Sequence, residues 1–93
     1  MEPMSRLIID VRTPDEYAAR HIEGAINISF NSPEFVTQIR AFPTDQEYVV
    51  YCNAGGRAGR ARAQMTSLGF EDVTSFGIMG ASVATGARVV YQS

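Results

Sequence analysis

The stretch that most constrains the fold is residues 48–60, with the sequence YVVYCNAGGRAGR. Its first four residues are aromatic or β-branched, which predicts a buried strand over 48–51. From the loop to about Leu68, the apolar residues are spaced for one face of a helix. Between strand and helix lies a short glycine-rich loop that begins at Cys52, the single cysteine of the chain. A strand, a tight loop and a helix in this order are typical of an α/β protein.

The loop has the features of an anion-binding site built around a reactive sulfur. Loops at the carboxyl ends of strands are where open α/β sheets bind ligands. Gly55 and Gly56 allow the backbone to turn its N–H groups inward, and a helix start has N–H groups without intrahelical partners. We expect these amides to surround the sulfur of Cys52 and favour its thiolate, with Arg57 and Arg60 adding positive charge. The alternative is a small buried hydrophobic residue, as lone cysteines often are. Since Gly-Gly-Arg does not suit a packed core, we favour the nucleophile.

The remaining chain alternates short apolar runs with helical patterns. Thr13-Pro14-Asp15-Glu16 is a capping box that starts a helix to about Arg20, and Ser32-Pro33 starts another in the same way, ending before Pro43. Strands are expected at 7–11, 26–28 and 73–75, one short helix within 77–86, and an edge strand or a packed-down end at 89–91. This alternation predicts an α/β fold with a mostly parallel sheet of four to five strands and helices on both faces.

Two motifs of the chain carry a family resemblance. One is CNAGGRA from Cys52 to Ala58, and the other is IDVRTPDEY over 9–17 followed by HIEGAINI over 21–28. The first resembles the active-site pattern C-x-x-G-x-R of the rhodanese-type sulfurtransferases, and the second is similar to the N-terminal pattern of that family. The resemblance covers about Leu7 to Val90 and is closest to the small single-domain members of the phage-shock protein E type. It implies the rhodanese-like fold, with Cys52 as the catalytic residue and a substrate-binding loop of Asn53, Ala54, Gly55, Gly56, Arg57 and Ala58.

The resemblance also implies a reaction. Cys52 would take a sulfane sulfur from thiosulfate or a similar small donor, form a persulfide, and pass the sulfur to a thiophilic acceptor. That acceptor is cyanide in an assay, and a thiol or a protein in the cell. Two alternatives stay open. One is a non-catalytic rhodanese-like module for binding or regulation, against which the retained cysteine argues. The other is a Cys-dependent phosphatase or arsenate reductase. Phosphatases have the pattern C-x5-R, whereas the sixth position after Cys52 is Ala58.

Polar residues outside the loop are expected at the rim of the same site. Asp10 and Arg12 come at the carboxyl end of the first strand, so we expect them to face the crevice of Cys52 and brace its loop. In that interpretation Asp10 accepts from Arg57 or from loop amides, and Arg60 lies at the rim. The alternative is a surface ion pair worth about 0–1 kcal/mol.

Four further features of the sequence bear on the site. Glu16 is interpreted as a capping residue, and His21 as structural. The segment from Phe76 to Ala81 departs from the family, which commonly has Gly-Gly followed by Trp there, so the wall of the pocket on that side is expected to differ. Arg20 stands where relatives have Gly.

Length and charge limit the number of domains and the kinds of partner that the chain can have. The chain has 93 residues and a formal net charge of −2. We expect one domain over 1–93 with a loose tail over 1–6, no nucleic-acid or membrane partner, and a monomer. No residues have metal-ligand spacing, so neither a metal nor another cofactor is expected. The N-terminus lacks the regions of a signal peptide, which predicts a cytoplasmic protein, or a periplasmic one if this is a processed mature form.

Overall fold

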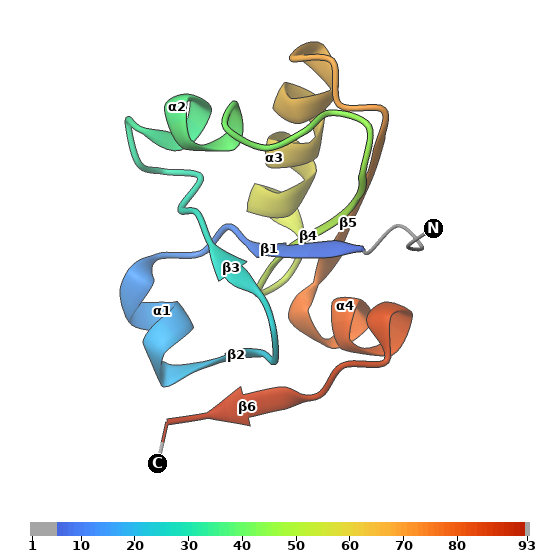
Figure 1. Ribbon diagram of the computed structural model, residues 1–93. Coiled ribbons are helices and arrows are strands. Elements are labelled where there is room, and N and C mark those ends of the chain that lie inside the picture. The colour runs from blue at the N-terminus through green and yellow to red at the C-terminus, as the bar shows by residue number, and fades with distance from the viewer. Residues whose placement is uncertain (1–5, 93) are drawn as a thin grey trace.

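The computed structural model describes residues 6–92 (Figure 1). Its main sheet has the strand order β3-β1-β4-β5, and every neighbouring pair is parallel. These strands are β1 (Leu7–Asp10), β3 (Ile26–Asn27), β4 (Glu47–Cys52) and β5 (Asp72–Gly77). A separate antiparallel pair joins β2 (Arg20–Ile22) to β6 (Val89–Tyr91). The helices are α1 (Pro14–Ala19), α2 (Phe35–Ile39), α3 (Gly56–Ser67) and α4 (Ile78–Thr85). The predicted α/β fold with a parallel sheet is confirmed.

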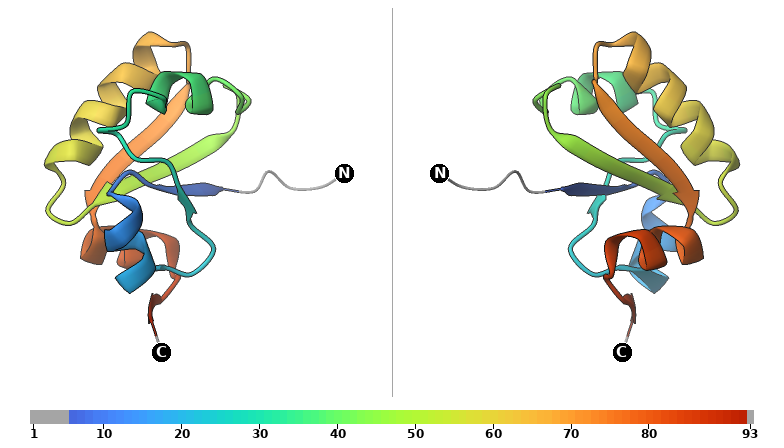
Figure 2. Two further views of the ribbon diagram at one scale, coloured as in Figure 1. Left: turned by 90° about the vertical axis from the view of Figure 1, so that its left-hand side faces the viewer. Right: turned by 90° about the vertical axis from the view of Figure 1, so that its right-hand side faces the viewer.

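Helices cover both faces of the main sheet because the strands alternate their side chains between two cores (Figures 1 and 2). Along β4, Tyr48, Val50 and Cys52 lie in the core shared with α2 and α3. Val49 and Tyr51 lie in the second core, which includes residues of β2 and α4. The alternation is complete over 48–52, where every residue is buried. As a result, β4 is packed on both faces as far as its carboxyl end.

The parallel arrangement brings three chain segments to one edge of the sheet. In register, Asp10 of β1 lies beside Tyr51, and Cys52 lies beside Gly77 of β5. The carboxyl ends of β1, β4 and β5 therefore meet at the same edge, where α/β sheets carry their ligand sites.

Several predicted boundaries are corrected. The first helix begins with the expected capping box at Thr13 but ends at Ala19, and Arg20 is already extended, with φ −165° and ψ 149°. The second helix begins at Phe35 rather than at Ser32, because the Ser32 hydroxyl accepts from the Glu34 amide within a turn. Strand 89–91 exists, but it pairs with β2 and not with the main sheet.

The predicted tail over 1–6 falls mostly outside the described residues, which begin at Arg6. Arg6 itself is exposed and donates from Nη1 to the Ala84 carbonyl at 3.1 Å. Within residues 6–92, no helix is both long and apolar enough to cross a membrane.

Candidate active site

Cys52 lies at the last position of β4 with its sulfur surrounded by backbone donors. Its Sγ accepts from the Gly55 amide at 3.0 Å and from the Ala58 amide at 3.4 Å. Gly55 has φ +106°, a left-handed conformation that favours glycine, and it is the N-cap of α3. The sulfur therefore lies at the start of a helix, where amides are free and the helix dipole is positive. This arrangement can hold negative charge on Sγ or on an atom bonded to it.

The loop rests on the junction between β5 and α4. The Asn53 carbonyl accepts from the Ile78 amide at 3.3 Å. A Cβ on Gly77 would lie only 2.8 Å from that same carbonyl oxygen. This role of Gly77 was not identified from the sequence. The available signal was a glycine inside the segment 76–81, which departs from the family pattern. The loop keeps its shape because position 77 has no side chain.

Arg57 is fixed by a bidentate ion pair with Glu16 of α1. Arg57 Nη1 lies 2.9 Å from Glu16 Oε1, and Nη2 lies 3.2 Å from Oε2. The hydrogen bonds from Arg57 lower the pKa of Glu16 to about 2. The same bonds raise the pKa of Arg57, with a smaller contribution from the neighbouring Cys52. The expected contact between Asp10 and Arg57 is therefore wrong, because Arg57 pairs with Glu16. Glu16 does cap α1 as predicted, and it also contacts the loop.

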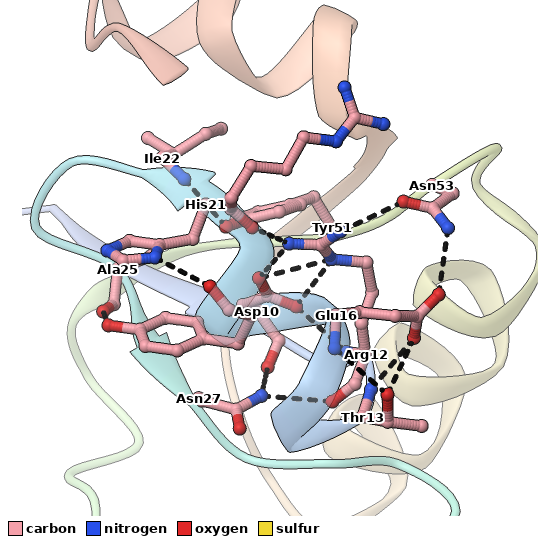
Figure 3. Close-up of polar contacts among 12 residues, drawn as sticks. Asp10, Arg12, Thr13, Glu16, His21, Ile22, Ala25, Asn27, Tyr51 and Asn53 are labelled. Atoms are coloured by element: carbon pink, nitrogen blue, oxygen red, sulfur yellow. Dashed lines mark hydrogen bonds and ion pairs between the residues drawn. The ribbon is translucent and has the colours of Figure 1, made fainter. Parts of the chain in front are cut away.

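Asp10 and Arg12 form a buried pair instead of a surface one. Arg12 Nη2 lies 2.7 Å from Asp10 Oδ2, and the two residues are 1% and 0% exposed. Arg12 Nη1 donates to the side-chain oxygen of Asn53 at 3.0 Å. Asp10 thus reaches the loop through Arg12, which is a different route from the expected direct bond to loop amides. Figure 3 shows Arg12, Asn53 and Glu16 in one continuous chain of contacts.

The remaining candidates lie outside this network. Arg60 is exposed on α3, one turn beyond Arg57. His21 Nδ1 lies 2.8 Å from the Tyr17 carbonyl, and its ring stacks on Tyr17 with centroids 3.9 Å apart. Such contacts agree with the structural role expected for His21. Within residues 6–92, no group of three or more His, Cys, Asp or Glu side chains is placed to hold a metal ion.

Comparison with known proteins identifies the family. A family model described as "Rhodanese-like domain" matches residues 1–77. Thiosulfate sulfurtransferase PspE of Escherichia coli is 39% identical over 71 residues, which cover 74% of this chain and 66% of that protein. Thiosulfate sulfurtransferase GlpE of Pseudomonas fluorescens is 37% identical over 70 residues, covering 74% and 62%. Protein HIGH ARSENIC CONTENT 1 of Arabidopsis thaliana is 34% identical over 79 residues, covering 74% and 47%.

A solved structure agrees with the sequence relatives. The structure described as "rhodanese with anions from E. coli" superposes with a TM-score of 0.74 at 28% identity, covering 94% of this chain and 99% of that chain. Among the curated relatives named above, the matches cover between 47% and 66% of the relative's length. The predicted resemblance is confirmed, and the chain belongs to the rhodanese-like domain family.

Proposed function

We propose that this protein transfers a sulfane sulfur from thiosulfate, or a similar donor, to a thiophilic acceptor through a persulfide on Cys52. The observation that carries the proposal is the position of Sγ at the start of α3, 3.0 Å from the Gly55 amide and 3.4 Å from the Ala58 amide. Two relatives named thiosulfate sulfurtransferase support the donor. The thiosulfate:glutathione sulfurtransferase of Saccharomyces cerevisiae, 32% identical over 81 residues, supports a thiol as acceptor.

The proposed reaction has two displacement steps at sulfur. In the first, the Cys52 thiolate attacks the outer sulfur of thiosulfate, the S–S bond of the donor breaks, and its electron pair leaves with sulfite. In the second, a thiophile such as cyanide attacks the outer sulfur of the persulfide. Thiocyanate leaves, and the Cys52 thiolate is regenerated. Charge and electrons balance in both steps without a cofactor, and ping-pong kinetics are expected.

The loop supplies the stabilisation that this chemistry needs. The Gly55 and Ala58 amides donate to the sulfur. In this proposal the amides from Asn53 to Ala58 stabilise the charge on the thiolate and on the persulfide. In this proposal Arg57 and Asn53 fix the loop through their bonds to Glu16. Asp10 supports the loop through Arg12, which donates to Asn53. Arg60 lies at the rim and attracts anionic donors.

The proposal extends to the domain, the oligomeric state, the compartment and the partners of the protein. We propose a single domain over 1–93 that works as a cytoplasmic monomer, with a small-molecule donor and a thiol or a protein as acceptor. The net charge of −2 supports the absence of a nucleic-acid partner.

Intact mass spectrometry tests the persulfide directly. Wild-type protein treated with thiosulfate is expected to gain the mass of one sulfur atom, and cyanide is expected to remove it as thiocyanate. The matched control is Cys52→Ser, which replaces the sulfur by oxygen and is expected to gain nothing. A Cys52→Ser variant that transfers sulfur at the wild-type rate would refute the mechanism.

A phosphatase assay separates this proposal from its nearest chemical alternative. Arg57 comes one position earlier than the arginine of the C-x5-R pattern, so the loop is shorter than a ring that holds a tetrahedral oxyanion. We expect no measurable hydrolysis of an aryl phosphate by the wild-type protein. Hydrolysis that disappears in Cys52→Ser would replace the sulfurtransferase proposal by a Cys-dependent phosphatase.

A further inference from the structure

Glu16 gathers donors from two separate segments of the chain. Its carboxylate accepts from the Thr13 amide at 2.9 Å and from the Thr13 hydroxyl at 3.2 Å, both at the start of α1. It also accepts from the side-chain amide of Asn53 at 2.9 Å, and from Arg57 at 2.9 and 3.2 Å. Figure 3 shows this carboxylate between Thr13 and Asn53. One side chain therefore ties α1 to two polar residues of the Cys52 loop.

Arg57 and Arg12 are each paired with a carboxylate beside the loop. Arg57 donates from two of its nitrogens to Glu16, and the Glu16 carboxylate, with a smaller contribution from Cys52, raises the pKa of Arg57. The Arg57 and Glu16 side chains are 22% and 30% exposed, so solvent screens their interaction only in part. Arg12, the other arginine that contacts the loop, is neutralised by buried Asp10. A reagent that approaches the sulfur thus meets oriented amides next to two neutral ion pairs.

We propose that Glu16 is a positioning residue that sets the charge selectivity of the Cys52 site, because it holds the loop through Arg57 and Asn53 and cancels the Arg57 charge. For sulfur donors this inference rests on the proposed function. Removing the negative charge leaves Arg57 free to attract anions. The same change removes a support of the loop. A variant without the Glu16 charge is therefore expected to attract anions more strongly and to transfer sulfur more slowly.

The sharpest test is alkylation of Cys52 by two reagents of similar shape and different charge. Glu16→Gln keeps a side chain suited to the capping box and removes the charge. The rate with anionic iodoacetate, divided by the rate with neutral iodoacetamide, is expected to rise about three- to tenfold over wild type. Both reagents react with the same thiolate, so the ratio cancels any change in the ionisation of Cys52. An unchanged or lower ratio would overturn the proposal.

Thr13→Ala is the matched control, because it weakens the cap of α1 and leaves Arg57 paired with Glu16. Its alkylation ratio is expected to equal that of wild type, and an equal rise in both variants would assign the effect to α1 stability and overturn the role of Glu16. In steady-state assays, Glu16→Gln is expected to lower both KM for thiosulfate and kcat, while a raised KM would contradict the charge argument. The alkylation ratio needs no sulfur transfer. A wild-type protein without transferase activity would therefore refute the proposed function alone.

Discussion

At the scale of single residues, the space at Gly77 decides whether the active loop keeps its shape. A Cβ there would lie 2.8 Å from the Asn53 oxygen and 3.3 Å from the Ala54 carbonyl carbon, both backbone atoms that cannot rotate away. We expect Gly77→Ala to push the loop off β5, lower the free energy of unfolding by about 1–3 kcal/mol and reduce sulfur transfer. Urea unfolding and the mass assay for the persulfide measure the two effects.

Gly59→Ala is the control for that substitution. Gly59 lies within α3, and a Cβ built there would have no atom within 4 Å apart from its chain neighbours and the backbone of its own helix. Alanine is the better helix former, so this variant should gain about 0.5–1 kcal/mol of stability. Equal destabilisation of the Gly77 and Gly59 variants would show that space at Gly77 is not the reason.

The sequence predicted the loop of the site but not the partners of its two arginines. The place of Cys52 and its glycine-rich loop followed from local pattern alone, since strand, loop and helix are contiguous. The partners of Arg57 and Arg12 did not follow. Glu16 and Asn53 are each 41 positions away from the arginine they contact. Such pairs depend on how β1 and α1 lie beside β4, and on side-chain rotamers, which a single sequence does not reveal.

At the scale of elements, the ion pair between α1 and the loop makes stability depend on pH. Bonding to Arg57 holds the pKa of Glu16 at about 2, below its ordinary value of 4.5. A lowered carboxyl pKa contributes stability that is full above the unfolded value and is lost as the pH falls toward the folded one. Because the pair is partly exposed, we expect it to contribute about 1–2 kcal/mol at pH 7 and little near pH 2.

Urea unfolding of wild type and Glu16→Gln at pH 7, 4 and 3 checks this expectation. Taking the difference between the two proteins removes the contribution of the other carboxyl groups. The difference should shrink steadily as the pH falls. A difference that stays constant from pH 7 to pH 3 would show that the charge of Glu16 does not stabilise the fold.

The elements that the sequence did not predict are those held by distant partners. Residues 17–20, Tyr-Ala-Ala-Arg, continue a helical pattern, yet the chain becomes extended at Arg20 because 20–22 pair with 89–91. Residues 20–22 lack the length and alternation that would identify a strand locally. The end at 89–91 was expected as an edge strand or a packed-down segment, but its pairing with 20–22 was not. Of the strands of the main sheet, β4 is the clearest in the sequence because residues 48–51 form a continuous buried run, whereas β3 carries a single large apolar residue, Ile26, which is 37% exposed.

At the scale of the whole molecule, one hydroxyl links the main sheet to the small one. Tyr51 of β4 is fully buried, and its hydroxyl oxygen accepts from the Ile22 amide of β2 at 2.9 Å. Burial raises the pKa of Tyr51, so the hydroxyl stays neutral at physiological pH. The bond connects β4, an inner strand of the main sheet, to the separate pair β2–β6.

Tyr51→Phe should therefore loosen the small sheet and leave the ring packing intact. It leaves the buried Ile22 amide without its partner, which costs about 1–3 kcal/mol of unfolding free energy. The matched control is Tyr91→Phe, since Tyr91 lies in β6 with 68% of its surface exposed and should change stability by less than about 0.5 kcal/mol. Amide hydrogen exchange at Ile22 should speed up in the first variant alone. If Tyr51→Phe is as stable as Tyr91→Phe and the Ile22 amide stays protected, then the pairing with β6 holds β2 in place without help from β4.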